Sequence, residues 1–100
     1  MKKIVLLCGG GMSTSILARK MEKAGQEIDY PVDVHAYGVG ELCKVAKDAD
    51  LILIGPQIRY LCDKVKTKVP DKLVEVIDMK DYGAMDGKKV LMHAKTLFEN

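Results

Sequence analysis

The run Ile4-Val5-Leu6-Leu7-Cys8, followed at once by Gly9-Gly10-Gly11, decides the fold of this 100-residue chain. An unbroken apolar run of this length is typical of a strand that is buried on both faces of a parallel sheet. Residues 51–54 form a second such run, whereas residues 32–36 and 74–76 alternate apolar and polar side chains. Because alternation is typical of strands with one wet face, we expect two central strands and two edge strands.

Apolar residues at helical spacing follow each of the four strands. The spacing predicts helices over residues 17–28, 42–49, 58–65 and 90–98. Asp86 is a suitable N-cap for the last helix, and Pro70 should end the third helix before the fourth strand. The order βαβαβαβα predicts a three-layer α/β fold, with a four-stranded parallel sheet and helices on both faces. With strands one and three in the centre, the strand order is 2-1-3-4.

The bulk composition favours a globular chain of one domain, residues 1–100. Apolar residues make up 48% and charged residues 30%, and the net charge of +2 is too small to indicate nucleic acid binding. No apolar run approaches the roughly 18–20 residues that span a bilayer. The four apolar residues before Cys8 are also fewer than the roughly 7–15 of a secretion-signal core, so we expect a cytoplasmic protein without membrane insertion.

The cysteines and histidines predict neither a disulfide scaffold nor a metal site. Cys8, Cys43 and Cys62 include no C-x-x-C pair, which fits a reducing cytoplasm. Cys43 and Cys62 fall on apolar helical stripes, so we expect both in the core. His35 and His93 lie far apart with no ligand spacing around them, and they are expected to be solvated or structural.

The segment Cys8-Gly9-Gly10-Gly11-Met12-Ser13-Thr14-Ser15 is expected to carry the chemistry. It leaves a buried strand and enters a helix, at the switch between strands one and three where open α/β sheets bind ligands. The glycines let the backbone approach a ligand closely, and the free N–H groups of the first helical turn attract an anion. Ser13, Thr14 and Ser15 add hydroxyl donors, and a helix N-terminus favours the reactive thiolate of Cys8.

Three other interpretations of this segment remain open from the residues alone. It could be a tight strand-to-helix turn without chemistry, or a non-catalytic anion-binding regulatory site. It could also belong to a stand-alone Cys-dependent phosphatase or an arsenate-reductase-like enzyme. The low-molecular-weight tyrosine phosphatases carry C-x5-R, but here the arginine position is Thr14. That arginine binds phosphate and stabilises the transition state, so its absence favours a carrier that leaves the reaction to a partner protein.

The segment from Cys8 to Ser15 resembles the phosphorylation loop of the lactose/cellobiose-type IIB proteins of the bacterial phosphotransferase system. Further similarity lies in Tyr30-Pro31-Val32, in residues 50–58 with Gly55-Pro56-Gln57-Ile58, and in residues 74–78 followed by Tyr82-Gly83 and Asp86-Gly87. The similarity extends over nearly the whole chain.

The resemblance implies a protein-phosphohistidine–sugar phosphotransferase with a phosphocysteine at Cys8 and no cofactor. The donor would be a phosphohistidine of a IIA protein. The acceptor would be a sugar bound by the membrane IIC permease, with a β-linked disaccharide implied by the family. The implied fold is that of the small tyrosine phosphatases. The sugar itself is expected to be selected in the permease, and a monomer that meets its partners transiently is the default.

A few further residues are expected near the site or on the partner surface. Gln57 and Tyr82 are expected beside the site, and Met12 is expected to be an exposed apolar contact for the partners. Asp81 occupies a late loop where a small tyrosine phosphatase carries its general acid, yet it can be a turn residue only. Arg59 and the lysines Lys64, Lys66 and Lys68 are expected to be solvated.

Overall fold

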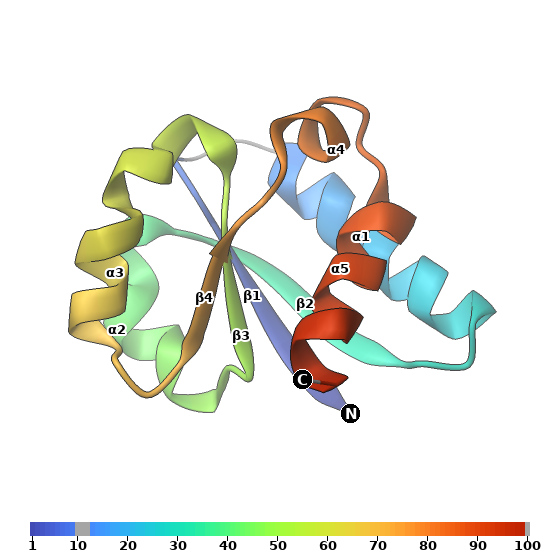
Figure 1. Cartoon of the computed structure of the whole chain (residues 1–100), viewed down its shortest axis with the longest axis horizontal. Helices are drawn as coiled ribbons and strands as arrows, with labels where there is room; N and C mark the ends of the chain where they lie inside the picture. Colours follow the sequence, from blue (N-terminus) through green and yellow to red (C-terminus); the bar gives the residue numbers. More distant parts are fainter. Residues whose placement is uncertain (10–12, 100) are drawn as a thin grey trace.

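Four parallel strands form one sheet in the order β2-β1-β3-β4, which confirms the predicted order (Figure 1). β1 (Lys2–Cys8) and β3 (Leu51–Ile54) are central, and β2 (Val32–Gly38) and β4 (Leu73–Val76) are the edges. The computed structural model describes residues 1–9 and 13–99, except for the side chain of Ser13. All of β3 and the last five residues of β1 are buried, which explains their unbroken apolar sequence.

Helices cover both faces of the sheet, so the molecule has the three predicted layers (Figure 1). On one face, α1 (Ser13–Glu27) and α5 (Gly87–Glu99) pack apolar side chains such as Leu17, Met21 and Leu91 against β1. On the other face, the region of α2 (Leu42–Val45) and α3 (Cys62–Lys68) packs against the sheet. The apolar stripes read from the sequence therefore face the sheet.

Two of the predicted helices are interrupted by 3₁₀ turns. The second is reduced to the single turn of α2 between η1 (Val39–Glu41) and η2 (Ala46–Asp48). The third begins as η3 (Pro56–Leu61) and becomes α-helical only at Cys62, after a non-helical residue, Ile58, with φ −117° and ψ 26°. Apolar spacing indicates which side of a segment is buried, but it does not distinguish i→i+3 from i→i+4 hydrogen bonds.

The prediction that Cys43 lies in the core is wrong, because its side chain is exposed. Leu42 occupies the position of this short turn that faces the sheet, with 3% of its surface exposed, and the next residue therefore points outward. Cys62 is half-buried and packs against the same apolar cluster, so it lies at the margin of the core.

The short helix α4 (Met79–Gly83), between β4 and α5, is an addition to the four predicted helices. It was not predicted, because five residues are too few to show a helical period. Asp78 caps it: its Oδ1 accepts hydrogen bonds from the N–H groups of Lys80 at 2.8 Å and Asp81 at 3.3 Å. The predicted N-cap of the last helix is confirmed, because Oδ1 of Asp86 accepts from the N–H of Lys89 at 3.1 Å. Pro70 follows the end of α3, as expected.

Candidate functional site

Cys8 is the last residue of β1, at the carboxyl end of a central strand between β2 and β3. Its side chain is only 8% exposed, and its Sγ lies 3.7 Å from the backbone oxygen of Tyr37, to which the thiol donates. Gly38 pairs with Cys8 in the parallel register, and a Cβ built on Gly38 would meet no described atom within 4 Å. The sulfur therefore lies at the carboxyl end of the sheet, beside the topological switch point.

The segment after β3 lies against the same end of β1. The N–H of Gly55 donates to the oxygen of Leu7 at 2.9 Å. A Cβ built on Gly55 would lie 3.3 Å from Oε1 of Gln57 and 4.0 Å from Cε2 of Tyr82. Gln57 and Tyr82, which are far apart in sequence, therefore both lie near Gly55. Gly55 in turn is hydrogen-bonded to Leu7, the residue before Cys8.

A hydrogen bond joins the start of α1 to α4. Oγ1 of Thr14 lies 3.1 Å from Oη of Tyr82, across 68 residues of sequence. Thr14 is 1% exposed, so its hydroxyl is buried beside the expected anion site. The sequence indicated Thr14 as a hydroxyl donor for phosphate and Tyr82 as a neighbour, but no local pattern reveals that these two side chains meet.

Part of the predicted phosphate-binding loop lies outside the described residues. Gly10, Gly11 and Met12 belong to that part, so their predicted roles stay predictions, as does the role of the Ser13 hydroxyl. Gly9 is described, and a Cβ built there would lie 3.5 Å from Cγ2 of Ile58. Ser15 is exposed and lines a groove between α1 and β2.

The arginine and the lysines that were expected at the surface are exposed: Arg59 lies in η3, and Lys64, Lys66 and Lys68 lie in α3. The other arginine, Arg19, for which nothing was predicted, is exposed in α1. Neither arginine occupies the sixth position after Cys8, where the small tyrosine phosphatases place theirs.

Both histidines are exposed, as the sequence predicted. Nε2 of His35 lies 2.8 Å from Oδ1 of Asp33, and Nε2 of His93 lies 3.6 Å from Oε1 of Glu75. Within residues 1–9 and 13–99, no group of three or more His, Cys, Asp or Glu side chains is arranged to hold a metal ion. No helix in the described part of the chain is both long enough and apolar enough to cross a bilayer.

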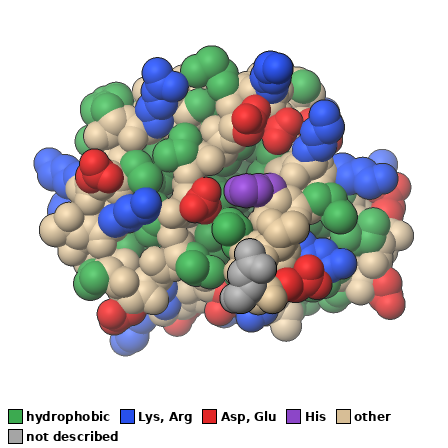
Figure 2. Space-filling view, in the orientation of Figure 1, with side chains coloured by type: hydrophobic (Ala, Val, Ile, Leu, Met, Phe, Trp, Pro, Cys, Tyr) green, Lys and Arg blue, Asp and Glu red, His purple; other side chains and the backbone are tan. Residues whose placement is uncertain are grey.

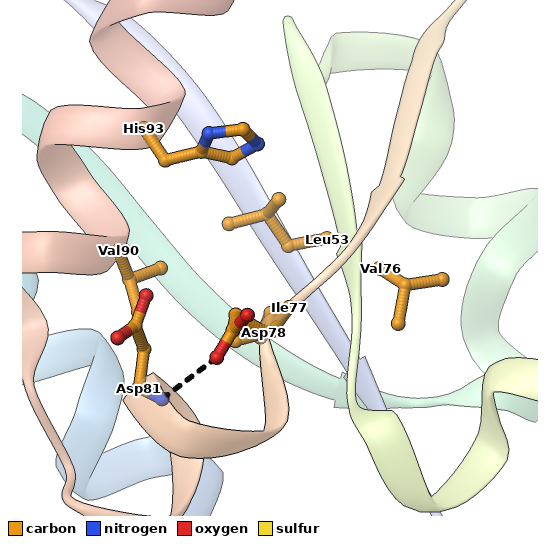
Figure 3. Close-up of a pocket in the computed structure, with 7 residues that line it drawn as sticks. All are labelled: Leu53, Val76, Ile77, Asp78, Asp81, Val90 and His93. Carbon is orange, nitrogen blue, oxygen red and sulfur yellow. Dashed lines mark hydrogen bonds between the residues drawn. The ribbon is translucent and has the colours of Figure 1, made fainter.

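Asp81 belongs to a separate pocket between β4 and α5 (Figure 3). The pocket has a volume of about 290 Å³ and is also lined by Asp78 and His93. The neighbouring residue, Tyr82, contacts Thr14 instead. Adjacent residues of α4 thus contribute to two different places, and no described residue of the loop after β1 lines the pocket.

Comparison with known proteins decides the family. The family model described as "PTS system, Lactose/Cellobiose specific IIB subunit" matches residues 3–93. The chain belongs to this family. The predicted resemblance is confirmed, and the chain is a sugar-specific IIB component of lactose/cellobiose type in a family of phosphotransferases.

Two relatives match this IIB component over nearly their whole length. The oligo-beta-mannoside-specific EIIB component of Bacillus subtilis is 42% identical, with 100% of this chain and 99% of that protein covered. The solution structure of the cellobiose-specific IIB component from Borrelia burgdorferi is 35% identical, with a TM-score of 0.80 over 99% of this chain and 93% of that one.

Two further matches bear on the fold and on a partner protein. The lactose-specific IIB domain of Streptococcus pneumoniae shares the fold at a TM-score of 0.86 and 18% identity, with 95% of each chain covered. The lactose-specific EIICB component of Staphylococcus epidermidis is 29% identical to 97% of this chain, which spans 17% of that protein. In such relatives the IIB part and the IIC part share one polypeptide, which supports a partnership between IIB and IIC.

Proposed function

We propose that Cys8 of this IIB component accepts a phosphoryl group from a phosphohistidine of a IIA protein and donates it to a sugar bound by the IIC permease. The observation that carries the proposal is the position of Cys8, at the carboxyl end of a central strand and at the topological switch point. The sugar would be a β-linked disaccharide. We also propose that residues 1–100 act as one domain, in the cytoplasm, as a monomer that binds its partners transiently.

Each half-reaction exchanges one bond to phosphorus. In the first, the Cys8 thiolate attacks phosphorus, an S–P bond forms, and the N–P bond breaks with its electron pair left on the imidazole. In the second, a sugar hydroxyl attacks phosphorus and releases its proton to solvent, an O–P bond forms, and the S–P bond breaks with its electron pair left on the Cys8 thiolate. The N–H groups of the loop and of the first turn of α1 would hold the phosphoryl oxygens in both steps, because transfer depends mainly on positioning and charge stabilisation.

Several features favour the carrier over a phosphatase. Thr14 stands where a phosphatase would carry its arginine, and its hydroxyl lies 3.1 Å from Tyr82. Asp81, at the position of a phosphatase general acid, lines the pocket beside α5 with His93. A protein that has no arginine at this position, and whose late aspartate lines a different pocket, can hold a phosphoryl group but lacks the means to hydrolyse it quickly.

Peptide mass spectrometry tests the proposal directly. The protein would be incubated with phosphoenolpyruvate, the general phosphotransferase proteins and a IIA partner. We expect one phosphoryl group, carried on the peptide that contains Cys8. Absence of the adduct with several IIA partners would contradict the proposal, and turnover of an aryl phosphate under the same conditions would favour a phosphatase.

Tyr82 is proposed as a positioning residue for the first turn of α1. Tyr82→Phe removes the oxygen that lies 3.1 Å from Thr14 Oγ1, and we expect a loss of about 1 kcal/mol in unfolding free energy. If the same energy holds the anion site in place, transfer to Cys8 should slow by about fivefold. Urea unfolding and single-turnover transfer from phospho-IIA measure the two effects.

Tyr60→Phe is the matched control, because Tyr60 is 75% exposed and its hydroxyl is solvated. It should change neither the unfolding free energy nor the transfer rate. If the Tyr82→Phe protein is less stable but transfers at the wild-type rate, the Thr14–Tyr82 hydrogen bond stabilises the fold without positioning the site.

A further inference from the structure

A pocket lies between β4 and α5, apart from the site at Cys8 (Figure 3). Leu53, Ile77 and Val90 form an apolar floor, and Asp78, Asp81 and His93 stand around it. Its volume of about 290 Å³ lies just below the roughly 300–1,000 Å³ of small-molecule sites. The pocket is therefore suited to one or two side chains of a partner protein.

The polar lining of this pocket is acidic. Among the described residues, its lining includes the carboxylates of Asp78 and Asp81 and no lysine or arginine. Glu75 is not part of the lining, but its carboxylate lies 3.6 Å from Nε2 of the lining residue His93. Figure 2 shows a histidine with an acidic and several apolar side chains near the middle of this face. The pocket is thus acidic in a chain whose net charge is +2.

The carboxylate of Asp81 is available for a partner. Within the described part of the chain, its backbone N–H donates to Asp78, but its carboxylate accepts no hydrogen bond and forms no ion pair. A half-buried carboxylate over an apolar floor suits a lysine or arginine, because such a side chain buries its aliphatic stem and presents its charge at the end.

Beside the pocket, β4 is an edge strand of the sheet. Among the described residues, no strand pairs with the outer edge of β4. Leu73 of this strand is 46% exposed, and it faces the α5 side of the sheet because it pairs in register with Leu51. β4 lies two strands from β1, about 10 Å, so a protein bound at Cys8 could also reach the pocket.

We propose that this acidic pocket binds a lysine or arginine in a cytoplasmic loop of the IIC permease, an inference that rests on the proposed phosphocarrier function. The argument is charge complementarity. Cytoplasmic loops of membrane proteins carry an excess of lysine and arginine, whereas the anionic lipid surface around them repels carboxylates. The pocket thus directs the Cys8 end of the sheet towards the permease and away from lipid.

Binding to the permease tests this proposal without any phosphoryl transfer. The probe is inside-out membrane vesicles that contain the IIC permease of the same sugar system, with permease-free vesicles as background. Co-sedimentation of the unphosphorylated chain gives the dissociation constant. We expect Asp81→Lys to weaken binding at least about tenfold and Asp81→Asn to weaken it less, because the former adds repulsion to the loss of attraction.

Asp71→Lys is the matched control, since Asp71 is exposed in the turn before β4 and outside the pocket. It makes the same charge change and should stay within about twofold of wild type. Equal binding by Asp81→Lys and wild type, or no permease-dependent binding by wild type, overturns the pocket proposal. Phosphorylation of Cys8 by phospho-IIA, measured on the same proteins, should be unchanged; its absence from wild type would instead overturn the proposed function.

Discussion

Cys8→Ser is expected to give a folded protein that accepts no phosphoryl group from phospho-IIA. A serine hydroxyl is protonated near neutral pH and is a weak nucleophile without an adjacent base, whereas a cysteine supplies thiolate. Loss of a nucleophile usually costs several orders of magnitude, so we expect the transfer rate to fall at least about a thousandfold. Mass spectrometry of the peptide that contains residue 8, after incubation with phospho-IIA, measures the loss.

Cys43→Ser and Cys62→Ser serve as matched controls, because each makes the same chemical change elsewhere in the chain. Cys43 is exposed and Cys62 is half-buried, and both belong to the layer formed by α2 and α3. Both variants should accept one phosphoryl group at the wild-type rate. Full phosphorylation of Cys8→Ser, or loss of phosphorylation in one of the controls, would assign the acceptor to another residue.

Gly87→Ala is expected to destabilise the fold by about 3 kcal/mol, the upper end of the usual cost of overpacking. Gly87 begins α5 where this helix lies against α1. A Cβ built on Gly87 would lie 2.6 Å from Cβ of Lys20, 2.7 Å from its carbonyl carbon and 2.8 Å from the nitrogen of Met21. Two of these atoms belong to the backbone, so relief requires the two helices to separate. Urea unfolding at fixed pH measures the change.

Gly83→Ala is the control for this prediction. Gly83 ends α4, and a Cβ built there would meet no described atom within 4 Å. Alanine is the better helix former by up to about 1 kcal/mol, so this variant should be neutral or slightly more stable. If Gly87→Ala were as stable as Gly83→Ala, the close approach of α1 and α5 at this point would be wrong.

The strands were predictable because the residues that they bury are consecutive, or alternate, in the sequence. Residues 4–8 and 51–54 are apolar without interruption and lie in the centre of the sheet. The edges alternate, and the strand order followed from that difference. The sequence located the helical segments but did not predict whether each is an α-helix or a 3₁₀ helix. The kink at Ile58 and the single turn of α2 depend on packing that apolar spacing does not describe.

Sequence by itself therefore determined the family, through motifs that extend over nearly the whole chain. It also determined the strand order and the place of Cys8, because both depend on short runs of apolar residues. Only the tertiary structure brought Tyr82 to Thr14, exposed Cys43, and placed Asp81 in a pocket with His93. These facts depend on contacts between residues far apart in the chain, and on the side of a short turn that faces the sheet. Local sequence does not encode them, because the folding of the whole sheet decides which distant side chains meet.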